Sequence, residues 1–570
     1  MEGMKWSLLS DPLFRVIGCD GHRAEMTLPE VLASLARKEI SGFTALQRYQ
    51  RDMWLAFLVQ IAVMGMARKG DNVPYENADD WKSALLELSD GDEGTWCLYV
   101  EDTRRPAFMQ YPIESVDLFA NSDSPEVIRA PKNIDTLVTA NHIDTKDEGG
   151  NDGVDAWIYA LVSKQTNTLA VGVATVSCVR SAGSGRYFFE VVSSPDFATR
   201  FVEGVTRGIH QRKEYLGDTF ASYEFRDDGL ALMWFVPWHG HINEERPSTA
   251  GLDPFFVESA RHYRCHPLRG EIAFLEYKPF TKDKQENKID GRIISLDFLK
   301  KHPIPDPWMP FELKKDKPVG FYKLGNNGIP VDKVRDLLIS DKLMRSRLQK
   351  PETSGTVFAC ISSVARANGK TIGYHERIIP IPGKVSLAVF DRDNPQHKLL
   401  GELSKFGVNA AGTVSKKLVG VARILVNGNV KNDVSFEPFL VNGMDRFIEN
   451  GFFEWLWSSV DDEPLMAKVK WIEMLKEKAI GLFQEACMKY LCSSDMWMVK
   501  HDGTLRLKYG INGEFKSVYN QVNKKTKKGG GRKRKERKSS GNEVVDRRPV
   551  KEEHNHASKP VEAPKQASLF

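Results

Sequence analysis

The chain has 570 residues, of which 41% are hydrophobic and 27% are charged, and this length is too great for one ordinary core. The composition is that of a soluble globular protein with two or three domains. The net charge of +4 is uneven, because the residues from Lys524 onward carry a net +9 and leave about −5 for the rest. This distribution excludes a uniformly basic nucleic-acid binder, so any contact with DNA or RNA must use local patches.

The seven cysteines are scattered and include no pair with CxxC spacing. They support neither a disulfide framework nor a zinc site, and a reducing cytoplasm is the expected location. The N-terminus shows no signal-peptide pattern. The longest apolar run, from Met53 to Met66, is interrupted by Gln60 and is too short to span a bilayer. It predicts a buried helix, and we expect no membrane contact.

The N-terminal region begins with two predicted helices. Thr27 and Glu30 have the spacing of a capping box ahead of an apolar face. Residues 95–118 predict short strands and turns. Between them, the segment 44–67 predicts a second helix, because its apolar residues recur at helical spacing. These residues are Leu46, Tyr49, Met53, Phe57, Ile61 and Met64.

The character of the chain changes near residue 390. From about 130 to 390, strand-like and helical segments mix without a regular βαβ rhythm, which predicts an irregular α+β domain. After about 395 the segments are long and helical and predict a helical bundle. One stripe of that bundle consists of Trp471, Leu475, Ala479, Leu482 and Ala486.

The predicted organisation is an α+β domain over 1–390, a helical bundle over 391–522 and a basic tail over 523–570. The tail has almost no apolar residues before its last two and cannot bury a core, so we expect it to be disordered.

Motifs of catalysis are not found: there is no P-loop, dinucleotide fingerprint, HExxH or GxSxG. His239 and His241 have no neighbouring carboxylate or cysteine cluster, so we interpret them as structural. Residues 261–267, which hold two histidines and a cysteine, are interpreted as a partly buried helix end. The tripeptide HNH at 554–556 lies in the tail and not in a folded metal site. We expect no enzymatic activity, no cofactor and no metal.

Several segments occur in an order that is hard to produce by chance, among them "QRYQRDMWLAFLVQIA", "NIDTLVTANHIDTK", "PDPWMPFE" and "RANGKTIGYHER". In this order they resemble the large, CasA-type subunit of the type I-E CRISPR Cascade complex, over about residues 5–380. The resemblance implies a C-terminal four-helix bundle and a DNA-recognition subunit. Such a subunit reads the PAM in duplex DNA, helps to open the duplex and start the R-loop, holds the displaced strand and docks a helicase–nuclease. Base pairing reads the long sequence, while protein reads the PAM and the duplex shape.

The segment "RANGKTIGYHER" matches a hairpin that acts in this family as a wedge beside the PAM. The resemblance places Asn368, Gly369, Lys370 and Thr371 at its tip. Asn can bond to base edges, Lys neutralises phosphate and Gly allows close backbone approach. Better-known members have a glutamine here, which this chain lacks. The alternative is an ordinary Asn-Gly turn between two strands.

A second segment, "NTLAVGVATVSCVRSAGSGR", matches a glycine-rich loop that approaches the PAM from the minor groove. The resemblance implies DNA contacts for Val171, Gly172, Val173 and Arg180. Minor-groove readout separates A·T from G·C more easily than all four pairs, so a tolerant PAM preference is expected. The alternative is a strand edge followed by a Ser/Gly turn.

A third segment, residues 139–152, matches a loop that reaches the crRNA 5′ handle and the neighbouring Cascade subunits. Asn141, His142 and Lys146 are the implied contacts. The acidic residues beside them would repel phosphate, so a protein partner is expected for that half of the loop; a solvated acidic loop is the alternative.

Phosphate contacts are also considered for two basic stretches. Lys278, Lys282 and Lys284 are interleaved with acidic residues and favour a mixed-charge surface. Lys527, Arg532 and Arg534 belong to the tail, which would strengthen binding without reading sequence and weaken as salt rises. A solubilising tail is the alternative.

The chain ends in "QASLF", in which Gln566, Ser568, Leu569 and Phe570 resemble the peptide that docks on the bacterial sliding clamp. A chance match is the alternative. For the whole protein, two other interpretations remain open. One is an adaptor that acts through protein contacts with little DNA readout, and the other is a metal-dependent nuclease with an unrecognised site.

Overall fold

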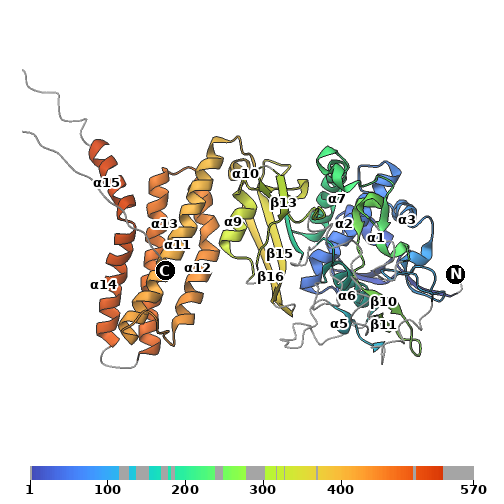
Figure 1. Ribbon diagram of the computed structural model, residues 1–570, viewed down its shortest axis with the longest axis horizontal. Helices are drawn as coiled ribbons and strands as arrows, with labels where there is room; N and C mark the ends of the chain where they lie inside the picture. Colours follow the sequence, from blue (N-terminus) through green and yellow to red (C-terminus); the bar gives the residue numbers. More distant parts are fainter. Residues whose placement is uncertain are drawn as a thin grey trace, which may run out of the picture. The chain divides into compact units, whose positions relative to one another are not determined.

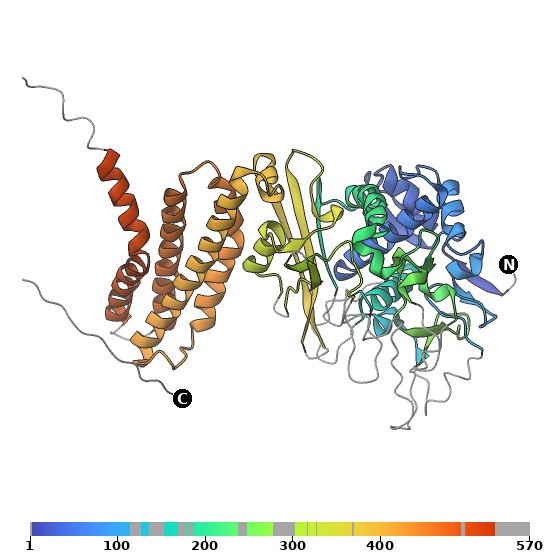
Figure 2. The same cartoon turned by 45° about the horizontal axis from the view of Figure 1, so that its top comes forward.

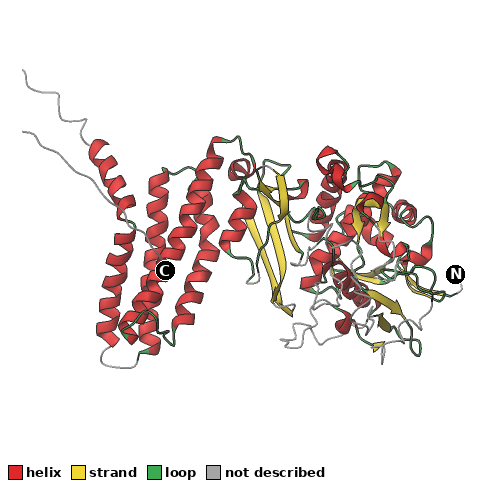
Figure 3. Ribbon diagram, in the orientation of Figure 1, coloured by secondary structure: helices red, strands yellow, loops and turns green. Residues whose placement is uncertain are grey.

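The computed structural model describes residues 3–114, 127–135, 153–168, 178–180, 186–237, 248–277, 302–315, 317–325, 328–367, 370–491 and 496–529. Within these ranges the side chains of 277, 365–372 and 525–529 are not described. The described residues form helices and several small, separate β-sheets, which confirms the predicted α+β class (Figure 3).

The N-terminal region packs its helices around a central helix, α2 (Arg51–Lys69), that is buried over most of its length. Every residue of α2 from Asp52 to Met66 is buried, as predicted from the apolar run. The helix begins later than the periodicity indicates, because Arg48–Gln50 form a 3₁₀ turn, η1, before it. The helices around it are α1 (Leu28–Ala36), α3 (Ala78–Glu87), α6 (Val154–Asn167) and α7 (Phe197–Tyr215).

The capping box predicted at the start of α1 is confirmed. The Thr27 hydroxyl accepts a hydrogen bond from the backbone N–H of Glu30, and the Glu30 carboxylate accepts one from the backbone N–H of Thr27 at 2.7 Å. Both bonds satisfy backbone donors that the first turn of a helix leaves open.

Two glycines allow α7 to lie close against α2. A Cβ atom added at Gly204 would stand 2.9 Å from Val59 Cγ2, and one added at Gly208 would stand 2.7 Å from Val63 Cγ2. Such approaches are shorter than real Cβ contacts, so a side chain at either position would push the two helices apart.

The strands form small sheets of two or three members, with the orders β1-β5, β3-β2-β4, β8-β9, β10-β11-β6 and β13-β12-β14 among them. Their bounds are β1 Met4–Ser7, β2 Phe14–Gly18, β3 Arg23–Met26, β4 Ile40–Phe43, β5 Cys97–Val100, β6 Val127–Ile128, β8 Leu230–Leu232, β9 Leu252–Val257, β10 His262–Cys265, β11 Phe274–Tyr277, β12 Phe311–Lys314, β13 Lys317–Phe321 and β14 Leu343–Met344.

Strand β10 corrects the expectation of a helix end at 261–267. Residues His262–Cys265 pair antiparallel with β11, and all four are buried. Arg264 is held in the interior, where its guanidinium donates to the carbonyls of Val100 (3.1 Å) and Asp102 (3.2 Å). The conformation of this buried strand depends on its pairing with β11, and four residues are too few to show a hydrophobic period.

The remaining sheet has the order β16-β15-β7, with bounds β7 Tyr187–Val192, β15 Val357–Ala367 and β16 Lys370–Ile381. It lies between the N-terminal helices and the C-terminal helices, next to α9 (Val331–Ile339) and α10 (Gly383–Phe390) (Figures 1 and 2). The longest strands of the described chain, β15 and β16, are thus in a sheet that stands between the two helical parts.

The C-terminal region is a bundle of α11 (Pro395–Asn427), α12 (Glu437–Ser458), α13 (Pro464–Tyr490) and α14 (Met496–Glu514). Helix α13 packs against each of the other three, and its predicted stripe from Trp471 to Ala486 is buried. The Trp471 indole donates to the carbonyl of Gly407 at 3.0 Å and stacks on Trp455 with 4.9 Å between ring centroids. The predicted helical bundle is therefore observed.

A final helix, α15 (Lys516–Gly529), lies mostly in a second compact unit that begins at Ser517. It reaches Gly529, so its last residues lie within the segment 523–570 that was predicted as the basic tail. The segment carries many lysines but no proline, and lysine has a good helix propensity.

Candidate nucleic-acid interface

The hairpin β15–β16 contains the predicted wedge. The two strands are antiparallel, and the pair Ala367↔Lys370 leaves only Asn368 and Gly369 between them. These two residues lie outside the described part of the chain, and the side chains of Lys370 and Thr371 are also not described. The register is that of a two-residue hairpin, the type that an Asn-Gly sequence favours.

The turn end of the hairpin extends beyond its third strand. Strand β7 pairs with β15 from Phe358↔Val192 to Ser363↔Tyr187. Past Ser363, the described residues offer β15 no partner except β16, so this end is a two-stranded ribbon. In Figures 1 and 2 this end and helices α5 (Pro131–Ile134) and α6 lie toward the same side of the N-terminal region.

A β-bulge lies in the two-stranded part. The register runs from Ala365↔Gly373 to Arg366↔Thr371, so Ile372 is an extra residue in β16. A bulge increases the local twist and redirects the strand beyond it. The regular pairing of the ribbon is therefore interrupted shortly before its turn end.

Buried charges fix the base of the hairpin to the helical core. Arg200 on α7 bonds to Asp52 on α2 at 2.5 Å and to Glu190 on β7, and each of the three side chains is at most 6% exposed. Glu190 lies directly opposite Cys360 of β15. Burial alone lowers the pKa of the Arg200 guanidinium, but Asp52 and Glu190 outweigh it and hold that pKa well above its usual value. This triad joins the hairpin sheet to both α2 and α7.

The other edge of the hairpin is held by the bundle. Arg377 of β16 donates to the carbonyl of Glu449 on α12 at 2.9 Å, and the Trp457 indole of α12 donates to the carbonyl of Pro380 at 3.1 Å. Arg48 forms an ion pair with Glu376 at 2.7 Å. The hairpin is thus anchored at its base from both sides, while its turn end is not part of these contacts.

The predicted glycine loop has a closed base. Val171, Gly172 and Val173 lie outside the described residues, but Thr168 and Cys178 on either side of that segment are hydrogen-bonded to each other. The Cys178 N–H donates to the Thr168 carbonyl at 2.9 Å, and the Thr168 N–H donates to Cys178 Sγ at 3.0 Å. Both residues are buried, so the chain leaves and re-enters the core at one point.

A buried carboxylate supports this base. Glu258 accepts a hydrogen bond from the Val179 N–H at 2.6 Å, and its other oxygen has no hydrogen-bond partner among the described residues. Burial raises the pKa of Glu258 to about 7, although the nearby Arg180 and Arg186 act in the opposite direction.

Arg180 does not have the position expected of a DNA contact. Its side chain is fully buried, and its guanidinium donates to the carbonyls of Pro254 (3.0 Å), Phe256 (3.1 Å) and Pro305. It also lies over the Phe256 ring, 4.1 Å from the centroid. A guanidinium enclosed in this way cannot reach a phosphate, so Arg180 is corrected to a core residue that holds three backbone segments together.

The described residues on either side of the predicted crRNA-handle segment, 139–152, include buried carboxylates. Asn141, His142 and Lys146 lie outside the described residues. On one side, Asp135 accepts hydrogen bonds from Tyr49 and from Gln50, each at 2.6 Å. On the other, Asp155 at the start of α6 forms an ion pair with Arg15 at 2.6 Å.

Other predicted site residues are not placed by the structure. Lys527 belongs to α15, but its side chain is not described. Those outside the described residues are Lys278, Lys282, Lys284, Arg532, Arg534, Gln566, Ser568, Leu569 and Phe570, together with the histidines at 239, 241, 554 and 556. Within the described ranges, no group of three or more His, Cys, Asp or Glu side chains is arranged to hold a metal ion. Those ranges also contain no helix with the length and apolarity needed to cross a membrane.

Sequence reasoning did not identify the residues that anchor these segments. Asp52, Glu190 and Arg200 are far apart in the chain, and so are Asp135 and the residues that bond to it. Charged residues in apolar surroundings are the one available signal, as with Asp52 at the start of a helix that is otherwise buried. That signal does not say which partner each charge has.

The architecture now described, an α+β region joined to a helical bundle, is shared with CRISPR-associated proteins of known structure. Specifically, it is the fold of CasA (Cse1). The chain superposes on Thermus thermophilus CasA with a TM-score of 0.53 and 12% identity, over 90% of this chain and 100% of the other. The values for Thermobifida fusca Cse1 are 0.57 and 12%, over 90% and 98%.

A further match is a chain from a CRISPR RNA-guided surveillance complex, with a TM-score of 0.51 and 13% identity over 88% of this chain and 99% of the other. No family model matches the sequence, and no curated protein matches it significantly. At such identities the structures establish the fold, and in this respect the resemblance predicted from the sequence is confirmed.

Proposed function

We propose that this chain is the DNA-recognition subunit of a type I-E CRISPR Cascade complex. In that role it reads the PAM in duplex DNA, helps to open the duplex and start the R-loop, holds the displaced strand and docks a helicase–nuclease. It acts by binding and positioning, without catalytic chemistry of its own, and its partners are the other Cascade subunits, the crRNA 5′ handle and target DNA.

The observation that carries the proposal is the β15–β16 hairpin in a Cse1 fold. The pair Ala367↔Lys370, with two residues between its members, ends a ribbon whose base is anchored by Arg200 and by the contacts of Arg377 and Trp457. A rigid base is what a wedge between base pairs requires, because a compliant one would bend before the stacked pairs separate. Asn and Lys supply a base-edge partner and a phosphate partner.

The test is DNA binding by the reconstituted complex with and without this chain. Guide-matched duplexes carry randomised bases beside the protospacer, and bound sequences are recovered at two salt concentrations. We expect the chain to create a preference at those positions, and Asn368→Ala with Lys370→Ala to abolish it. Lys317→Ala, at an exposed lysine beginning the second strand of the β12–β13 hairpin, is the matched control and should retain the preference.

The outcome separates recognition from an adaptor role. A complex that gains stability but no PAM preference from this chain would contradict the proposal and support the adaptor. Loss of preference in the hairpin variants together with loss of assembly would not count as support, so assembly is measured for every variant by size-exclusion chromatography.

A further inference from the structure

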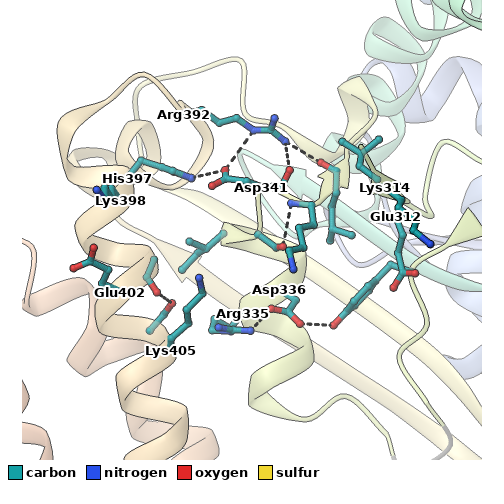
Figure 4. Close-up of a pocket in the computed structure, with 18 of the residues that line it drawn as sticks. Glu312, Lys314, Arg335, Asp336, Asp341, Arg392, His397, Lys398, Glu402 and Lys405 are labelled. Atoms are coloured by element: carbon teal, nitrogen blue, oxygen red, sulfur yellow. Dashed lines mark hydrogen bonds and ion pairs between the residues drawn. The ribbon is translucent and has the colours of Figure 1, made fainter. Parts of the chain in front are cut away.

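A pocket lies where the sheet β13-β12-β14 and helix α9 meet the start of α11. Its volume is about 930 Å³, within the upper range of ligand sites in proteins. Figure 4 shows its charged residues, with His397, Lys398, Glu402 and Lys405 on the α11 side. We call it the α9–α11 pocket.

Two of its acidic residues already have protein partners. Asp341 Oδ1 lies 3.0 Å from His397 Nε2, and the guanidinium of Arg392 approaches the same oxygen at 3.5 Å. Asp336 pairs with Arg335 and accepts a hydrogen bond from the Tyr322 hydroxyl at 2.8 Å. These carboxylates are committed to protein partners, so they do not form a site for a cation.

The basic residues exceed the acidic ones. Four lysines in the lining make no hydrogen bond or ion pair through their ammonium groups with the described residues, and only two glutamates, Glu312 and Glu402, are similarly uncommitted. All six are exposed, and the lysines come from strand β12, from the turn between α9 and β14, and from helix α11. The lysines are Lys314, Lys342, Lys398 and Lys405.

This arrangement differs from an ordinary charged surface in two ways. The lysines surround a concave space, so their fields add at one place where part of the solvent is excluded. Basic residues on solvated surfaces are often paired with carboxylates that balance them, as in the Lys489–Glu485 and Arg506–Asp502 pairs of the bundle. The first turn of α11 also lines the pocket, and the positive end of its dipole favours an anion.

We propose that the α9–α11 pocket binds a phosphate-bearing ligand of nucleotide size. Phosphate is the anion with enough charge and acceptors to engage several ammonium groups at once, and the volume exceeds what a single inorganic ion needs. The phosphates belong either to a free nucleotide or to a nucleic-acid backbone. This inference does not depend on the proposed function, since it concerns the protein without guide or target.

The test is calorimetric titration of the full chain with pyrophosphate, with ADP and with a short single-stranded oligonucleotide. We expect saturable binding that weakens as ionic strength rises. Lys342→Gln with Lys405→Gln should weaken it at least tenfold. Lys416→Gln, at an exposed lysine further along α11 and outside the pocket, should leave the affinity unchanged.

The probes separate the two sources of phosphate. Binding of ADP or pyrophosphate identifies a free phosphorylated ligand, and binding of the oligonucleotide alone identifies a nucleic-acid backbone. If each probe binds the double variant as tightly as the unaltered chain, or if none binds the unaltered chain, the proposal is wrong. Because both substituted lysines are exposed, the double variant should fold normally. Equal thermal unfolding midpoints of the double variant and the unaltered chain would verify this.

Discussion

Glu258 is a carboxylate whose burial has a consequence for stability. Its pKa is raised to about 7 in the folded chain, against about 4.5 for an exposed glutamate. Between these two pH values the folded state binds more protons than the unfolded state. The free energy of unfolding that Glu258 contributes is therefore greatest below pH 4.5 and falls as the pH rises through 7.

Replacing this carboxylate by an amide should remove the pH dependence. Glu258→Gln keeps an oxygen acceptor for the Val179 N–H, so we expect its stability relative to the unaltered chain to rise between pH 5 and pH 8. The gain should reach at most about 3 kcal/mol for a shift of this size. Urea unfolding at both pH values measures it. Glu352→Gln, at an exposed loop position, is the control: its free energy of unfolding should differ from that of the unaltered chain by the same amount at both pH values.

The triad of Arg200, Asp52 and Glu190 permits a second prediction. Arg200→Met leaves two carboxylates buried without their cation, which should lower the free energy of unfolding by about 3–5 kcal/mol. Adding Glu190→Gln should recover part of this loss, because one of the two uncompensated charges is then removed. Denaturant unfolding of both variants tests this. In contrast, Arg226→Met removes an exposed pair with Asp228 and should leave the unfolding midpoint unchanged.

At this scale the sequence indicates residue types better than it indicates partners. The Asn-Gly dipeptide predicts the two-residue hairpin at 368–369, because its backbone preference is local. Arg180 illustrates the opposite case. An arginine beside a Ser/Gly segment has the pattern of a phosphate contact, and only the three-dimensional path of Pro254, Phe256 and Pro305 shows that carbonyls surround it.

At the scale of elements, the close contact of α2 with α7 depends on two glycines of α7, which have no side chain to separate the helices. Gly208→Ala places a methyl group against Val63 and should lower the free energy of unfolding by about 1–3 kcal/mol, since a well-packed interface cannot accept it without shifting. Gly412→Ala, in α11 with open space around it, should instead raise stability by about 0.5–1 kcal/mol through helix propensity. Thermal or urea unfolding of the two variants should give opposite signs.

Long periodic elements could be predicted from the sequence, and short ones could not. The buried run of α2 and the Trp471 stripe of α13 follow from spacing alone, because many residues repeat the same signal. Strand β10 has four residues, and its pairing with β11 decides its conformation. Helix α2 also begins later than its apolar spacing predicts, because the 3₁₀ turn Arg48–Gln50 continues that spacing ahead of the helix.

For the whole molecule, the basic residues after Gly529 predict a salt-dependent contribution to DNA binding. A chain ending at Gly529 should lower the affinity of the complex for any duplex, with the largest effect at low salt and a smaller slope of log affinity against log salt. PAM preference should be unchanged, because backbone charge carries no sequence information. Filter-binding at several salt concentrations tests this. A change in preference with an unchanged slope would show that the tail reads sequence instead.

The anchoring of the β15–β16 hairpin also has a mechanical meaning. The ribbon is a cantilever: it is clamped at its base by Arg200 on one side and by α12 on the other, and beyond Ser363 its strand β15 pairs only with β16 among the described residues. A load applied at its turn produces a torque at the clamp. Since that clamp joins α2, α7 and α12, the torque is transmitted to both helical parts of the molecule at once.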